Sequence, residues 1–83
     1  MYKLVFEKRA LRNLDKLDNA IRMRIWNKLQ ECKEDPFRFV EHLEYLNGFK
    51  LRVGDYRIIL DIDKTAGIIT ILKLDHRSKI YHN

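Results

Sequence analysis

The stretch GFKLRVGDYRIILDIDKTAGIITILKLDHRSKIYHN, residues 48–83, carries the clearest structural signal in this chain. Apolar and polar residues alternate from its first positions onward, with the period of two that is typical of a β-strand. Gly54-Asp55 has the composition of a two-residue hairpin turn with glycine first, and residues 63–67 form the next turn. Residues 68–74 are apolar on both faces, as expected of a covered central strand. We therefore predict three consecutive antiparallel strands.

The same turn sets the register of the first hairpin. It places Arg52 opposite Arg57 and Lys50 opposite Ile59, so that these four side chains share one face of the sheet. The other face is apolar and is predicted to meet the core. Lys73 interrupts the apolar pattern of the last strand, and the alternation alone assigns it to neither face.

The first half of the chain predicts a strand followed by two helices. Residues 2–6 alternate as a strand does, and residues 8–17 then change to helical spacing. Asp18 is suited to cap a second helix with its side chain, and Pro36 is expected to end that helix. The residues predicted to face the core are Ala10, Leu11, Leu14 and Leu17 in the first helix, and Ile21, Ile25, Trp26, Leu29 and Cys32 in the second. A connection this short makes the two helices an antiparallel hairpin.

Residues 37–46 have no clear period, and we expect a loop that anchors its apolar side chains in the core: Phe37, Phe39, Leu43 and Leu46. Together these elements predict one α+β domain spanning residues 1–83. Its helix hairpin packs on a four-stranded, mostly antiparallel sheet.

The bulk composition narrows the classes of function. The chain has 83 residues and a net charge of +5, which favours a polyanionic partner such as nucleic acid, or an acidic protein; simple solubility is the alternative explanation. Its single cysteine, Cys32, lies on a helical apolar stripe, and no zinc-type spacing is present. No stretch resembles a membrane span or a signal peptide, so we expect a cytoplasmic protein.

A candidate site for a phosphate-backbone substrate follows from the cations of the hairpin and the polar ending of the chain. Arginine forks bind phosphate oxygens bidentately, and lysine, histidine and tyrosine can carry protons or stack on bases. The alternative is that the two opposed arginines point into water and that Asp61 or Asp55 relieves their repulsion. The candidate residues are Lys50, Arg52, Arg57, Arg77 and Tyr81 for chemistry, and Lys73, His76 and Lys79 for RNA binding, with His82 as a further possible proton carrier.

Three segments resemble the RelE/ParE superfamily of toxins from toxin–antitoxin systems, and the RelE branch in particular. They are RALRNLDKLD at 9–18, GFKLRVGDYRIIL at 48–60 and HRSKIY at 76–81. The resemblance implies a β-α-α-β-β-β fold of the microbial-ribonuclease type. It also implies a ribosome-dependent endoribonuclease that cuts messenger RNA in the A site without metal or cofactor, and an antitoxin that wraps the toxin's surface.

Matching positions carry the family's functional residues onto Lys50, Arg52, Arg57, Arg77 and Tyr81. Two positions depart from some RelE proteins: Gly48 stands where a further lysine occurs, and Asp75-His76 replaces part of a basic run. The residues suit cleavage of RNA by its own 2′-OH. In that reaction Arg57 and Arg77 stabilise the charge on the phosphate and Arg52 orients the backbone, while Lys50 is the first candidate for general base and Tyr81 stacks on a base or assists the leaving oxygen. A DNA gyrase inhibitor of the ParE type and a non-catalytic RNA-binding module are the alternatives.

Overall fold

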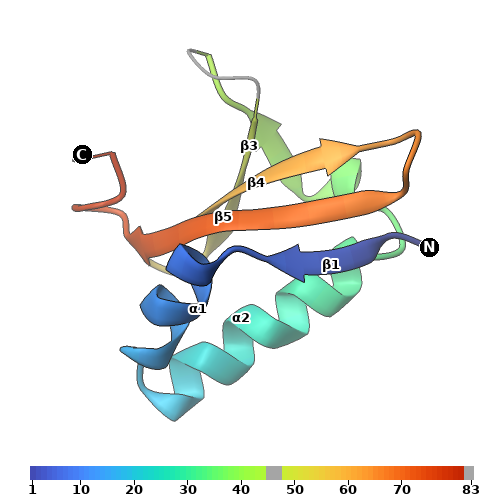
Figure 1. The fold of residues 1–83 in the computed structure, drawn as a ribbon. Helices are drawn as coiled ribbons and strands as arrows, with labels where there is room; N and C mark the ends of the chain where they lie inside the picture. Colours follow the sequence, from blue (N-terminus) through green and yellow to red (C-terminus); the bar gives the residue numbers. More distant parts are fainter. Residues whose placement is uncertain (45–47, 82–83) are drawn as a thin grey trace.

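The computed structural model describes residues 1–44 and 48–81, and it contains one five-stranded mixed sheet with both helices on the same side (Figure 1). The strand order is β1-β5-β4-β3-β2, with β1 parallel to β5 and the other pairs antiparallel. The elements are β1 (Lys3–Phe6), α1 (Lys8–Asp15), α2 (Asn19–Cys32), the 3₁₀ helix η1 (Pro36–Arg38), β2 (Val40–His42), β3 (Phe49–Val53), β4 (Tyr56–Asp63) and β5 (Ile68–His76). The α+β class and the consecutive antiparallel β3, β4 and β5 are confirmed.

The strand count was wrong by one, because part of the expected loop at 37–46 forms η1 and β2. Strand β2 has only three residues, too few to show a period of two in the sequence, and it is stabilised by pairing with Phe49–Leu51 of β3. Phe37, expected in the core, is 40% exposed, whereas Phe39 packs against the core as expected. Leu46 lies outside the described residues.

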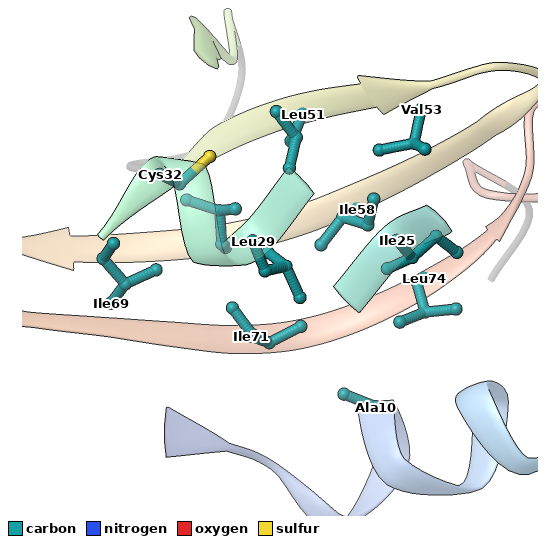
Figure 2. Close-up of a cluster of buried hydrophobic side chains, with 11 residues drawn as sticks. Ala10, Ile25, Leu29, Cys32, Leu51, Val53, Ile58, Ile69, Ile71 and Leu74 are labelled. Atoms are coloured by element: carbon teal, nitrogen blue, oxygen red, sulfur yellow. The ribbon is translucent and has the colours of Figure 1, made fainter. Parts of the chain in front are cut away.

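The core lies between the helices and one face of the sheet (Figure 2). Ile25, Leu29 and Cys32 of α2 are buried there, as their helical spacing predicted. The apolar stripe of α1 was predicted too wide, because Leu11 is 46% exposed. Trp26 is 43% exposed and stacks on Phe6, with ring centroids 6.2 Å apart.

Two local expectations about the helices have different outcomes. Asp18 does occupy the N-cap position of α2, but its side chain makes no capping hydrogen bond. The predicted helix end near Pro36 is close, since α2 stops at Cys32 and Pro36 begins η1. None of the described helices is long and apolar enough to cross a membrane.

The β3–β4 hairpin has the predicted register, with Arg52 opposite Arg57 and Lys50 opposite Ile59. Gly54 has a φ of 58°, a value that L side chains avoid and that the first position of such a turn requires. An irregularity between β4 and β5 then assigns Lys73 to a face. Lys73 lies opposite Ile59, so it shares the face of Lys50 and the two arginines.

Candidate functional site

The sheet surface that faces away from α1 and α2, which we call the open face, gathers most of the predicted site residues. Directly opposed residues in a sheet share a face, so the register places Lys50, Arg52, Arg57 and Lys73 there. The chain after β5 turns to the side of the sheet away from the helices (Figure 1). Lys50 Nζ lies 5.8 Å from the centroid of the Tyr81 ring.

The burial of Ile59 supports this placement of the C-terminal turn. Ile59 faces away from the helices and is outside the main core, yet it is only 4% exposed, so another segment must cover it. Ile80, next to Tyr81, is likewise 2% exposed and outside the main core. We infer that the C-terminal turn packs its isoleucine over Ile59 and thereby fixes Tyr81 beside Lys50.

Glu41 is the residue of this cluster that the sequence analysis missed. It lies directly opposite Lys50 in the β2–β3 pair. Its carboxylate is 3.6 Å from Lys50 Nζ and 3.1 Å from Arg52 Nε, and Arg52 Nη2 donates a further hydrogen bond of 3.5 Å to it. No signal in the sequence identifies Glu41, because Phe39-Val40-Glu41-His42-Leu43 shows no alternation and Glu41 joins the cluster only through the β2–β3 pairing.

Arg57 and Arg77 lie around the hairpin turn rather than beside Lys50. Arg57 Nη1 donates hydrogen bonds of 2.9 Å to the carbonyl oxygens of both Gly54 and Tyr56. The Arg77 backbone N–H donates to the Asp55 carbonyl oxygen at 2.7 Å, and Arg77 Nε is 3.8 Å from the Asp55 carboxylate. Both guanidinium groups are therefore oriented by the same turn.

The groups that contact the opposed arginines, Arg52 and Arg57, differ from the expected Asp55 and Asp61. Arg52 is paired with Glu41, and Arg57 is held by backbone carbonyl oxygens. Asp55 instead forms its ion pair with Arg77.

The remaining predicted RNA-binding residues divide into two groups. His76 stands edge-on to the Tyr56 ring, and its Nδ1 lies 2.9 Å from Ser78 Oγ and accepts the Ser78 backbone N–H at 3.2 Å. Lys73 and Lys79 instead line a small pocket of about 40 Å³ together with Arg9 and Asn13 of α1. The structure thus brings these two lysines together in a pocket that Lys50 does not line, and His82 lies outside the described residues.

A larger pocket of about 440 Å³ opens beside Lys50. It is lined by Glu41, His42, Leu43, Glu44, Lys50 and Tyr81. The pocket therefore combines a cation for a phosphate, a carboxylate that can accept a proton, and an exposed aromatic ring that can stack on a base. Within residues 1–44 and 48–81, no group of three or more His, Cys, Asp and Glu side chains is placed to hold a metal ion.

Cys32 is remote from this chemistry. It is 1% exposed and packs in the core under α2 (Figure 2). Burial raises the pKa of its thiol to about 11, an effect that the Lys28 charge partly opposes. A neutral, enclosed thiol is a poor nucleophile, and its burial agrees with the apolar helical stripe on which the sequence places Cys32.

Comparison with known proteins identifies the class to which this arrangement belongs. Residues 4–81 match the family described as the ParE toxin of the type II toxin–antitoxin system parDE. No match was found among curated proteins.

Solved structures with the same fold cover nearly the whole chain. A chain of the RelBE2 toxin–antitoxin complex of Mycobacterium tuberculosis is 30% identical, with a TM-score of 0.84 over 92% of this chain and 98% of the other. A chain of the archaeal RelE–RelB complex of Pyrococcus horikoshii is 27% identical, with a TM-score of 0.81 over 94% and 97%. A chain of the intact Escherichia coli RelBE toxin–antitoxin complex is 25% identical, with a TM-score of 0.78 over 92% and 96%.

The fold and the matched length together define a toxin of the RelE/ParE superfamily. Within that class, the chain belongs to the ParE toxin family of type II toxin–antitoxin systems.

Proposed function

We propose that this toxin is a ribosome-dependent endoribonuclease that cleaves messenger RNA through attack by the RNA's own 2′-OH. The observation that carries the proposal is the convergence of Glu41, Lys50 and Arg52 of the sheet with Tyr81 of the C-terminal turn beside a 440 Å³ pocket. A protein that only blocks another enzyme by binding has no need of proton carriers placed among phosphate-binding cations. The similarity to RelE chains over more than nine-tenths of the sequence supports the same assignment.

The cations have two tasks in this mechanism. Arg52 orients the RNA backbone, while Arg57 and Arg77, held by the hairpin turn, stabilise the charge that builds on the phosphate oxygens. One such preorganised donor is typically worth about 10²–10³ in rate. Tyr81, which is 60% exposed, is free to stack on a base next to the cleaved bond.

We assign the role of proton acceptor to a different residue from the one predicted from the sequence. Sequence reasoning favoured Lys50, but an ion pair with Glu41 at 3.6 Å is formed by the charged ammonium, which has no free electron pair. Glu41 is an ionised carboxylate in the same pair. We therefore propose that Glu41 accepts the 2′-OH proton and that Lys50 supplies positive charge beside it.

A substitution at Glu41 separates these two roles. Glu41→Gln is expected to lower the rate at saturating RNA while RNA binding is retained or becomes tighter, because one negative charge is removed. Retained cleavage in Glu41→Gln would return the base to Lys50.

A second function, inhibition of DNA gyrase, is favoured by the match of residues 4–81 to the ParE toxin family. Primer extension on messenger RNA during induced expression, with a gyrase supercoiling assay in parallel, tests both. New 3′ ends within coding sequence and unchanged supercoiling are expected. Inhibited supercoiling with intact messages would favour the gyrase inhibitor.

We also propose that a cognate antitoxin neutralises this chain. The toxin–antitoxin complexes of the structural relatives and the net charge of +5 support an acidic or amphipathic partner. Co-expression of the gene for such a partner should restore growth in cells that are arrested by this chain.

A further inference from the structure

A second basic pocket lies at the other side of the β3 edge, outside the proposed reaction centre. It has a volume of about 320 Å³ and is lined by Arg24, Asn27, Lys28, Glu31, Arg52, Val53 and Gly54. We call it the edge pocket. It lies between α2 and the hairpin turn, and Arg52 is the side chain that it shares with the cluster on the open face.

The edge pocket is accessible because β2 is short. Strand β2 pairs only with Phe49–Leu51, so Arg52 and Val53 of β3 have no partner strand on their outer side within the described part of the chain. A chain of phosphates can therefore pass from the open face over Arg52 to α2 without crossing another strand.

The arginines around this edge have too few carboxylate partners nearby. The Arg24 side chain has no hydrogen bond or ion pair with any residue of the described ranges 1–44 and 48–81, and its guanidinium rests on the turn, where a Cβ at Gly54 would be 2.9 Å from Arg24 Nη1. Arg57 binds the carbonyl oxygen of the same glycine from the open face. Two guanidinium groups thus meet at one turn residue.

The positions of Arg24 and Lys28 on α2 also destabilise the helix when no anion is bound beside them. Arg24 and Lys28 are four residues apart and therefore share one side of the helix, where like charges destabilise it. Glu31 relieves Lys28, with 3.2 Å between Nζ and Oε2, but Arg24 has no such partner in the described part of the chain. An anion in the edge pocket would offset this repulsion.

We propose that the edge pocket binds a backbone phosphate of the same single-stranded RNA whose scissile phosphate lies on the open face. The RNA then crosses the β3 edge at Arg52, and Arg24 and Lys28 fix the register of the strand relative to Glu41 and Tyr81. This inference rests on the proposed function for its substrate. The pocket lies outside the reaction centre, so these two residues position RNA and do not take part in the bond-breaking step.

The direct test measures binding without cleavage. A short, fluorescently labelled single-stranded oligonucleotide with 2′-deoxy sugars is titrated with the toxin over a series of salt concentrations. Arg24→Gln and Lys28→Gln are each expected to weaken binding several-fold and to reduce the slope of log affinity against log salt by about 0.7, the value for one lost phosphate contact on a single strand.

Arg22→Gln is the matched control. Arg22 lies on the same helix but two positions from Arg24, hence on a different side, and its guanidinium contacts Asn19 at 3.3 Å. The substitution removes the same charge, and glutamine keeps the helix propensity nearly unchanged. Equal weakening by Arg22→Gln and Arg24→Gln would show a general charge effect and overturn the proposal, as would unchanged binding in Arg24→Gln.

A second readout identifies the ligand chemistry. Titration with inorganic phosphate should shift the NMR resonance of the Arg24 Nε–H group and leave that of Arg22 in place. If Arg24→Gln leaves oligonucleotide binding intact but weakens neutralisation by a co-expressed antitoxin, the pocket is a protein contact and the proposal is wrong.

These outcomes are independent of the proposed nuclease activity. If the unsubstituted toxin cleaves no message but Arg24→Gln still loses oligonucleotide binding, the proposal for the edge pocket stands and the proposed nuclease activity is rejected. Normal cleavage and normal binding in the same variant would retain the nuclease and reject the pocket.

Discussion

At the scale of single residues, Arg57 has the most decisive test. Arg57→Ala should abolish growth arrest, because it removes a cation that the turn holds over the open face. The fold should survive, since the loss of two hydrogen bonds to carbonyl oxygens near the surface costs only about 1 kcal/mol each. Growth curves at matched expression, with a thermal melt of each protein, measure both effects.

Arg12→Ala is the control for Arg57→Ala, because it removes the same charge from the exposed surface of α1, on the helix side of the molecule. It should leave growth arrest unchanged. Full toxicity of Arg57→Ala would remove this arginine from the site.

Cys32 provides a second prediction, on pH and reactivity. Its thiol should not react with a thiol reagent at about pH 8 in the native protein and should react rapidly in urea, because burial raises its pKa from 9.0 to about 11. In the unfolded chain the thiol ionises near its ordinary pKa, while the folded state keeps it neutral. The free energy of unfolding should therefore be unaffected by this group below pH 9 and fall by about 2–3 kcal/mol between pH 9 and 11.

A Cys32→Ala variant should lack that fall in stability above pH 9, although its overall stability is lower because of the cavity. Rapid labelling of the native wild-type thiol at about pH 8 would contradict the buried, neutral state.

At the scale of elements, the two turn glycines make a matched pair. Gly54 and Gly67 have φ values of 58° and 70°, so alanine at either position is strained by about 1–2 kcal/mol. A Cβ at Gly54 would also meet Arg24 at 2.9 Å, whereas a Cβ at Gly67 meets nothing within 4 Å. Gly54→Ala should therefore lower the free energy of unfolding at least as much as Gly67→Ala, and it alone should weaken RNA binding by displacing Arg24.

Urea denaturation and oligonucleotide binding measure the two effects on both variants. Equal RNA affinity in Gly54→Ala and Gly67→Ala would show that the turn at Gly54 does not position Arg24 for RNA binding, which contradicts the role proposed for Arg24 in the edge pocket.

The secondary-structure elements also differ in how well the sequence predicts them. The β3–β4 hairpin was predictable in its register because a two-residue turn with glycine first is flanked by strict alternation. Strand β2 was not, since three residues show no period and the strand depends on its pairing with β3. Glu41 was missed for the same reason, because it joins the site only through that pairing. The face of Lys73 required the β4–β5 irregularity, which depends on contacts between strands and leaves no mark in the sequence.

At the scale of the whole molecule, one face of the sheet contributes most of the stability and the other face carries the proposed function. The apolar face and both helices bury the core, where Ile25, Leu29 and Ile58 are fully enclosed. The open face is left to polar side chains from β2, β3 and β4 and to the turn that carries Tyr81. Substitutions on the open face should consequently change activity with little loss of stability, whereas Leu29→Ala should cost about 2–5 kcal/mol.

The chemistry of the whole complex is tested at the scissile phosphate. If the 2′-OH is the nucleophile, a ribosome-bound message with a single 2′-deoxy sugar at the cleaved nucleotide should bind but not be cut, because the attacking oxygen is missing. The products of the unmodified message should carry a 2′,3′-cyclic phosphate and a 5′-hydroxyl. A message with the 2′-deoxy sugar at a neighbouring nucleotide is the control and should be cut normally.

The proposed dependence on the ribosome follows from the geometry of the open face. The open face offers charge and a proton acceptor but is an exposed surface, with Arg52, Glu41 and Tyr81 all accessible to solvent. Such a surface does not by itself hold the 2′-oxygen in line with the leaving oxygen, and positioning of this kind can supply about 7–11 kcal/mol of the barrier. Naked RNA should therefore be cut far more slowly than the same RNA in the A site. Cleavage of the message with the 2′-deoxy sugar at the cut nucleotide would exclude this mechanism, whatever the ribosome contributes.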